Sequence, residues 1–140
     1  MLILTAISIE NSMQPEFILF VQDQSRSRDF YQAVLGISPI VDVPGMTEFD
    51  LGTGCKLGLM PEAGIARIIT PELRHPAEGS GIPRAELYLL VESASAYWER
   101  AVAMGAKLVS PPSPRNWGHT VGYFSDPDGH VLAFAEPTPP

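Results

Sequence analysis

The chain of 140 residues has one cysteine, few basic side chains and no long apolar run. With Cys55 alone, no intrachain disulfide can form, and a reducing cytoplasm is the expected compartment. No apolar stretch approaches the ~20 residues that a helix needs to cross a bilayer, so we expect no membrane partner. Residues 1–9 are apolar but lack the basic flank and cleavage site of a signal peptide, so we expect an N-terminal arm over 1–15.

Basic residues are outnumbered by acidic ones. Nine Lys and Arg against sixteen Asp and Glu give a formal net charge of −7. Nucleic acids are bound mainly through clustered Lys and Arg, so we expect no nucleic-acid partner. The negative charge favours a cationic ligand instead, because it raises the local concentration of cations. The chain also has no P-loop, no Cys-x-x-Cys pair and no Ser/His/Asp order, so three common kinds of active site have no support.

The clearest positive pattern is a two-fold internal repeat. One copy runs from Val21 to Gly36 as V-Q-D-Q-S-R-S-R-D-F-Y-Q-A-V-L-G, and the other from Val91 to Gly105 as V-E-S-A-S-A-Y-W-E-R-A-V-A-M-G. Each copy follows an apolar strand, continues through a polar turn into an amphipathic helix, and ends at a glycine. The strands that precede the two copies open on Glu16 and Glu86. A repeat of this kind predicts two similar modules with matched residues beside a shared site.

Each half predicts the element order β-α-β-β-β. In the first half, apolar and β-branched runs indicate strands at 17–21, 40–43, 47–51 and 55–60, with a helix from 23 or 25 to the glycine at 36. The second half has corresponding strands at 87–91, 107–109, 117–124 and 130–136, and a helix at 94–104. Neither half alone has enough core to fold by itself. We therefore predict one α+β domain, in which modules 16–60 and 85–136 form a curved mixed sheet around a concave cleft.

The remaining segments have no sustained period. Residues 61–84 are rich in Pro, Gly, Glu and Arg and are interpreted as a linker, the segment after 109 as a proline-rich loop, and 137–140 as a tail. Apolar stripes on the two helices predict their buried faces. These faces comprise Phe30, Tyr31, Val34 and Leu35 in the first helix, and Tyr97, Trp98, Ala101 and Val102 in the second.

Three segments carry a family resemblance. D-Q-S-R-S-R-D-F-Y-Q-A-V-L-G, R-A-V-A-M-G-A-K-L-V and Y-F-S-D-P-D-G-H-V-L-A-F-A-E resemble the vicinal oxygen chelate superfamily, over roughly residues 16–136. That superfamily includes lactoylglutathione lyases, extradiol dioxygenases, fosfomycin-resistance transferases and bleomycin-resistance binding proteins. The resemblance implies the two-module fold. It does not select an activity, because this fold hosts both enzymes and simple binders.

In metal-dependent members, four side chains on the concave floor hold the metal. The resemblance places the matching positions at Glu16, Gly58, Glu86 and Ala133, of which Gly58 and Ala133 have no ligating side chain. Two carboxylates suit Mg²⁺ or Mn²⁺ held weakly through water, whereas Zn²⁺ and Ni²⁺ favour imidazole. His119 could supply one imidazole if it faces inward, and is otherwise an ordinary strand histidine. We expect no cofactor, with a divalent ion (Mg, Mn, Ni or Zn) as the alternative.

The resemblance also places Glu16 and Glu86 in the cleft, where they are the candidate catalytic residues. Two close carboxylates would repel and raise at least one pKa, which would provide a general base or a site for a cationic group. The alternative is two solvated glutamates at the starts of strands. Aromatic and polar side chains could line the same cleft, although each could equally be core or turn packing. The candidate ligand-binding residues are Phe20, Phe49, Tyr88, Arg115, Trp117, His119 and Tyr123.

Three functions are compatible with these residues. The first is a small-molecule-binding protein similar to bleomycin-resistance-type members, without a complete metal site. The second is a glyoxalase-like lyase or isomerase with a carboxylate-only metal site. A dioxygenase-like enzyme ranks lowest, because the iron ligands of such enzymes are missing. Whether the protein is an enzyme stays open at this point, and we expect a homodimer.

Overall fold

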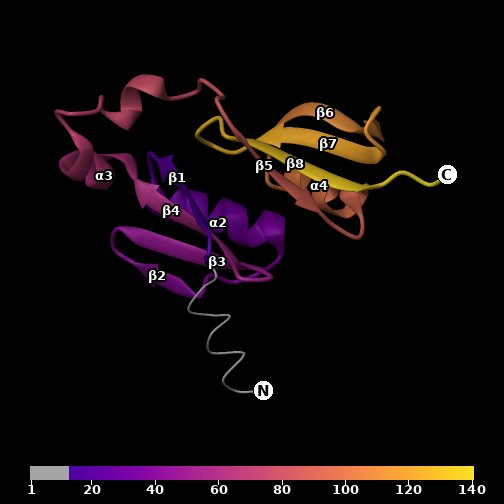
Figure 1. The fold of residues 1–140 in the computed structure, drawn as a ribbon, viewed down its shortest axis with the longest axis horizontal. Helices are drawn as coiled ribbons and strands as arrows, with labels where there is room; N and C mark the ends of the chain where they lie inside the picture. Colours follow the sequence, from indigo (N-terminus) through magenta and orange to yellow (C-terminus); the bar gives the residue numbers. More distant parts are fainter. Residues whose placement is uncertain (1–12) are drawn as a thin grey trace, which may run out of the picture.

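The computed structural model describes residues 13–140, which form two β-α-β-β-β modules (Figure 1). The first module consists of β1 (Glu16–Val21), α2 (Gln24–Leu35), β2 (Val41–Val43), β3 (Met46–Gly52) and β4 (Cys55–Pro61). The second consists of β5 (Glu86–Leu90), α4 (Ala94–Ala103), β6 (Lys107–Pro114), β7 (His119–Ser125) and β8 (Val131–Pro137). Between them lie α3 (Glu62–Ile69) and the 3-10 turn η1 (Pro76–Gly79). The predicted α+β class with two modules is confirmed, and residues 1–12 of the predicted arm lie outside the described residues.

The two modules have the same strand topology. Their strand orders are β1-β4-β3-β2 and β5-β8-β7-β6, with β1 parallel to β4 and β5 parallel to β8. The register is matched as well, because Ile18 lies opposite Gly58 in the first sheet and Tyr88 opposite Ala133 in the second. Within the described residues, each module has its own four-stranded sheet. The concave cleft between the sheets stays a prediction.

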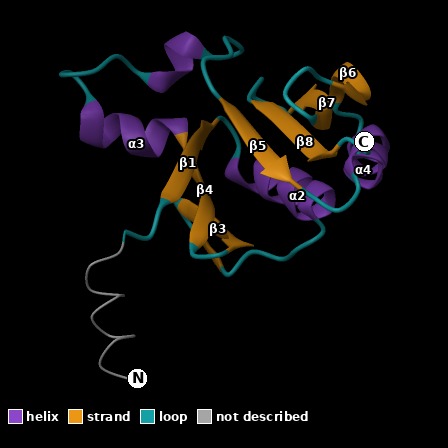
Figure 2. Ribbon diagram, turned by 45° about the vertical axis from the view of Figure 1, so that its right-hand side comes forward, coloured by secondary structure: helices purple, strands orange, loops and turns teal. Residues whose placement is uncertain are grey.

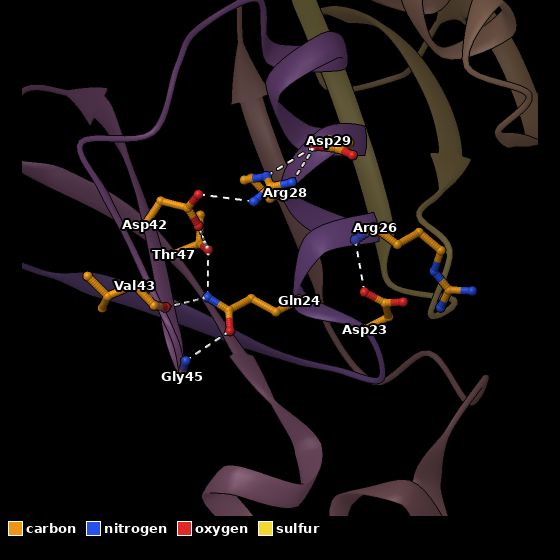
Figure 3. A network of polar contacts seen from close by, with 9 residues as sticks. All are labelled: Asp23, Gln24, Arg26, Arg28, Asp29, Asp42, Val43, Gly45 and Thr47. Atoms are coloured by element: carbon orange, nitrogen blue, oxygen red, sulfur yellow. Dashed lines mark hydrogen bonds and ion pairs between the residues drawn. The ribbon is translucent and has the colours of Figure 1, made fainter.

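Local sequence explains where α2 begins and ends. The Asp23 side chain accepts a hydrogen bond from the backbone N–H of Arg26 at 3.0 Å, and Gly36 ends the helix with φ at 71°. The Gln24 side chain then ties the helix to the β2–β3 hairpin (Figure 3). Its amide nitrogen donates to the Val43 carbonyl at 2.8 Å, and its amide oxygen accepts from Gly45 N at 3.0 Å. One side chain thus fixes the hairpin turn beside the start of α2.

Three segments differ from the sequence-based prediction. The linker contains α3, an eight-residue helix whose amphipathic period is too short to recognise in the sequence. The predicted proline-rich loop is instead the second half of β6, and proline is tolerated there because β6 is an edge strand with register shifts. Strand β7 begins at His119, so Trp117 lies in the preceding turn. On α4, the predicted inner residue Val102 is 45% exposed.

The main core belongs to both modules. Its buried side chains come from both helices and both sheets, and they include Phe30, Tyr31, Val34, Leu57, Ala101, Phe124, Leu132 and Phe134. Helix α2 packs against α4, where the Arg100 guanidinium donates to the Val34 carbonyl at 3.4 Å. Figures 1 and 2 show α3 at the opposite end of the molecule from α4. None of the described helices is long and apolar enough to cross a membrane.

The D-P-D-G turn before β8 forms hydrogen bonds to the first module. The Asp126 carboxylate is 4% exposed and accepts a hydrogen bond from the Tyr31 hydroxyl at 2.7 Å. Asp128 accepts from Gln22 N at 2.8 Å and from the Ser27 hydroxyl at 3.2 Å. The turn therefore holds the junction between β1 and α2 in place from the second module.

Replacing Tyr31 by Phe should destabilise the protein by about 1–3 kcal/mol, because the buried Asp126 carboxylate loses a donor. Chemical denaturation with urea would measure the change. Tyr97→Phe is the matched control, since the Tyr97 hydroxyl has no hydrogen bond among the described residues, and it should stay within about 0.5 kcal/mol of the unmodified protein. Equal losses in the two variants would contradict a specific role for the Tyr31–Asp126 bond.

Candidate functional site

One face of the first sheet has a crowded glutamate. We call the side chains of Glu16, Glu48 and Lys56 the first-sheet face, since strand pairing places Glu16 opposite Lys56, and Glu48 opposite Gly58. A Cβ atom added at Gly58 would lie 2.6 Å from Oε2 of Glu16. The Glu16 carboxyl therefore fills the space that a side chain at position 58 would need. Its Oε2 is buried and has no hydrogen-bond partner among the described residues.

The charge environment of Glu16 is unfavourable for ionisation. Burial, and next the neighbouring Glu48 carboxyl, raise the pKa of Glu16, and Lys56 partly offsets this effect. Lys56 is itself drawn to Glu48, with Nζ and Oε1 3.9 Å apart. Glu16 was expected beside Glu86, and the neighbouring Glu48 was not predicted. The alternation of Glu48 with Phe49 in a predicted strand was the signal that could have placed Glu48 on this face.

A second polar cluster lies on the second sheet. Trp117 Nε1 donates to the Tyr88 hydroxyl at 2.9 Å, and that hydroxyl lies 2.6 Å from Nδ1 of His119. Because an indole N–H can only donate, the Tyr88 oxygen accepts from Trp117 and is free to donate its own proton to His119. That assignment leaves the hydrogen of a neutral His119 on Nε2. The three side chains thus form one hydrogen-bonded chain.

Arg115 and Tyr123 extend this cluster. Arg115 Nη2 donates to the Ser110 hydroxyl at 2.8 Å and to the Val121 carbonyl at 3.2 Å, and its Cζ lies 5.2 Å from the centre of the Tyr123 ring. Its Nε is buried and has no partner among the described residues. Burial, and next the Glu86 carboxylate, raise the pKa of Tyr123, which places Glu86 in the same neighbourhood. We call Tyr88, Arg115, Trp117, His119 and Tyr123 the second-sheet face.

Five of the seven predicted ligand-binding residues are therefore brought together on the second-sheet face. Phe49 is a correction: it is fully buried in the main core, on the face of β3 that packs toward α2, because it pairs with the buried Leu57. Phe20 is half-buried and lines a separate cavity. Glu16 and Glu86 belong to different clusters, since Glu16 neighbours Glu48 whereas Glu86 neighbours Tyr123.

The metal shell that the family resemblance implies does not fit these residues. Position 58 is filled by the Glu16 carboxyl, and Ala133 is fully buried beneath the second-sheet face. Across residues 13–140, no three His, Cys, Asp or Glu side chains gather as metal ligands would. Nδ1 of His119 is engaged with the Tyr88 hydroxyl.

Comparisons with known proteins agree with this architecture. The profile of the Glyoxalase/Bleomycin resistance protein/Dioxygenase superfamily matches residues 14–134. An uncharacterized protein from Mycobacterium bovis is 24% identical over 135 residues, which cover 94% of this chain and 87% of that protein.

Two solved structures show the same fold. A glyoxalase-related enzyme from Fulvimarina pelagi has a TM-score of 0.74 at 22% identity, covering 90% of this chain and 88% of its own. TnmS3, an antibiotic-binding protein from Streptomyces sp. CB03234, has a TM-score of 0.67 at 26% identity, covering 91% and 97%.

Replacing Glu16 by Gln should raise the melting temperature at pH 7. A carboxyl whose pKa is raised by folding contributes stability that is complete below its unfolded pKa and is lost as the pH rises through its folded pKa. The neutral amide avoids that loss, so the gain should reach up to about 1 kcal/mol, or roughly 2–4 °C, at pH 7 and vanish near pH 4.

Glu48→Gln provides the control. If repulsion between the two carboxyls contributes to the effect, Glu16→Gln should add less stability in the Glu48→Gln background than in the unmodified protein. A gain from Glu16→Gln that is the same at pH 4 and pH 7 would contradict the assignment.

Proposed function

Because the chain belongs to the glyoxalase/bleomycin resistance protein/dioxygenase superfamily, we propose that it is a small-molecule-binding protein of the bleomycin-resistance type. Its ligand would lie on the second-sheet face and would be a planar aromatic molecule, cationic or neutral. In this proposal the protein sequesters its ligand without a metal and without chemical conversion. Glu16 and Glu86 would then act through their charge rather than as catalytic residues.

The observation that carries the proposal is the hydrogen-bonded chain of Trp117, Tyr88 and His119. Trp117 is 53% exposed, yet its indole N–H is held by Tyr88. An exposed aromatic ring that is already fixed in orientation loses little conformational entropy when a flat ligand stacks on it. The arrangement is therefore suited to stacking more than to the proton transfers of an active site.

The polar groups around the Trp117 ring indicate which hydrogen-bonding groups the edge of the ligand would carry. With Nδ1 engaged by Tyr88, a neutral His119 offers Nε2–H as a donor. Glu86 is exposed nearby and would admit a positive charge. The ligand class is thus a planar molecule with a hydrogen-bond acceptor at its edge. The similarity to TnmS3, an antibiotic-binding protein, supports the binding of a small molecule.

We also propose that two copies associate in the cytoplasm. Large apolar side chains on the first strands of both modules are exposed, with Phe17 at 62% and Leu90 at 61%. Exposed apolar side chains of this kind are often found at interfaces between subunits. A homodimer would remove them from water.

A second candidate is the glyoxalase-like lyase or isomerase with a carboxylate-only metal site. The observation that favours it is the Glu16–Glu48 pair, since a carboxyl with a raised pKa can accept a proton from a substrate. A divalent ion could also bridge the two carboxylates through water. The filled position at Gly58 counts against a complete metal shell.

Ligand binding can be followed through the tryptophans. In a Trp98→Phe variant, Trp117 is the one remaining tryptophan, and acridine orange should quench its fluorescence and raise the melting temperature. Tyr88→Phe should weaken binding about tenfold, because Trp117 and His119 lose their shared partner. Trp117→Phe is the control, since Trp98 packs against Phe124 and should show no quenching. Stabilisation by anionic compounds alone would contradict the proposal.

Metal loading separates the two candidates. After incubation with Mn²⁺ or Ni²⁺ and removal of free ions, elemental analysis should find far less than one ion per chain if the protein is a binder. One retained ion per chain, lost on replacing Glu16 by Gln, would favour the lyase instead.

A further inference from the structure

The linker segment borders an open cavity that the sequence did not indicate. It has a volume of about 770 Å³ and is lined by part of β1, by Glu62 at the start of α3, by residues between 74 and 85 and by the turn at 128–130. This volume is in the range of cavities that hold small ligands. We call it the linker pocket. Of the predicted site residues, it shares Phe20 alone, so it is distinct from the second-sheet face.

A carboxylate without a partner lines the linker pocket. Glu62 is the first residue of α3, the residue as a whole is 8% exposed, and no hydrogen bond or ion pair engages its side chain among the described residues. The N-terminus of α3 favours a negative charge at this position, because the helix dipole is positive there. A cation bound in the pocket would supply the partner that the described residues do not.

The other charged groups of the pocket are occupied or exposed. Arg74 is held by Glu78, with Nε and Oε1 2.8 Å apart. Asp128 is held by the β1–α2 junction through Gln22 N at 2.8 Å. Arg84 is exposed and has no ion pair among the described residues. Glu62 is therefore the carboxylate of this pocket that lacks a partner among the described residues.

A histidine and several apolar side chains also line the linker pocket. His130 Nε2 lies 2.9 Å from the Phe20 carbonyl, which only accepts, so the hydrogen is on Nε2 and a neutral His130 keeps Nδ1 as an acceptor. Ile18, Phe20 and Ile82 supply apolar wall. The pocket thus combines hydrogen-bond acceptors with apolar surface, which suits a donor-rich cation on an apolar body.

We propose that the linker pocket binds an organic ammonium ion with an apolar body, with Glu62 as its counter-ion. Three ammonium hydrogens could be shared between the Glu62 carboxylate and other acceptors of the wall, while the apolar part lies against Phe20 and Ile82. This site is additional to the proposed stacking surface. It does not depend on that surface being functional.

Hexylammonium is a suitable probe, with hexanol and hexanoate as neutral and anionic analogues of the same length. Titrations followed by amide chemical shifts should move the signals of Glu62, Ile82 and His130, and hexylammonium should bind about tenfold or more tightly than either analogue. Glu62→Gln should remove that preference. Glu72→Gln makes the same charge change at an exposed residue outside the pocket and should leave the affinity unchanged.

Two further variants test whether a loss of binding is due to misfolding, and whether Glu62 forms an ion pair within the chain. Ile82 is 63% exposed, so Ile82→Trp should obstruct the pocket and abolish binding without disturbing the core. Arg84→Gln should leave the melting temperature unchanged. If Arg84→Gln and Glu62→Gln lower the melting temperature by the same amount, the proposal is overturned. Glu62 would then be paired with Arg84 within the chain.

The outcome is separable from that of the stacking surface. Tyr88→Phe should leave hexylammonium binding intact even if it abolishes binding of acridine orange. Equal affinities for hexylammonium and hexanol, or shifts confined to Tyr88 and Trp117, would overturn the linker pocket and leave the proposed function to its own tests.

Discussion

The buried Asp126 carboxylate is the contact on which the arrangement of the two modules depends. Burial raises its pKa, while the hydrogen bond from Tyr31 and next the neighbouring His130 oppose that shift. Its other oxygen accepts from the backbone N–H groups of Asp128 and His130, so one side chain orders the turn and joins it to α2. The same turn is bonded to the residue that follows β1, because Gln22 N donates to the Asp128 carboxylate. It also forms part of the wall of the linker pocket. A single satisfied carboxylate therefore connects the shared core to the geometry of a candidate site.

The repeat is symmetric in backbone and asymmetric in chemistry. Gly58 and Ala133 occupy matched registers, opposite Ile18 and Tyr88. The small residue in the first sheet admits the Glu16 carboxyl, whereas the one in the second lies beneath tyrosines. One face is consequently acidic and crowded, and the other is aromatic and hydrogen-bonded. A fold of two equivalent modules can in this way carry two different surfaces on equivalent strands.

The errors of the sequence-based prediction have identifiable physical causes. Periodicity revealed both long helices but not α3, because eight residues with Glu62 and Ala66 as their buried positions give too little pattern. Phe49 was taken as a ligand contact, although it faces the core. The partner of Glu16 depends on how β3 and β4 pair, and strand register is a tertiary property. The pocket lined by linker residues likewise depends on tertiary packing, and no sequence motif predicted it.

The sequence by itself determined the two modules, their helix ends and the lack of metal ligands at Gly58 and Ala133. These features are local: they follow from apolar periodicity, from Asp23 and Gly36 at the ends of α2, and from side chains that have no donor atoms. Only the tertiary structure decided which polar groups meet. Glu48 reaches Glu16 through strand pairing, Trp117 reaches Tyr88 through a turn, and Glu62 is buried because α3 packs on β1. Such contacts join residues far apart in the chain, so their chemistry is set by packing rather than by spacing.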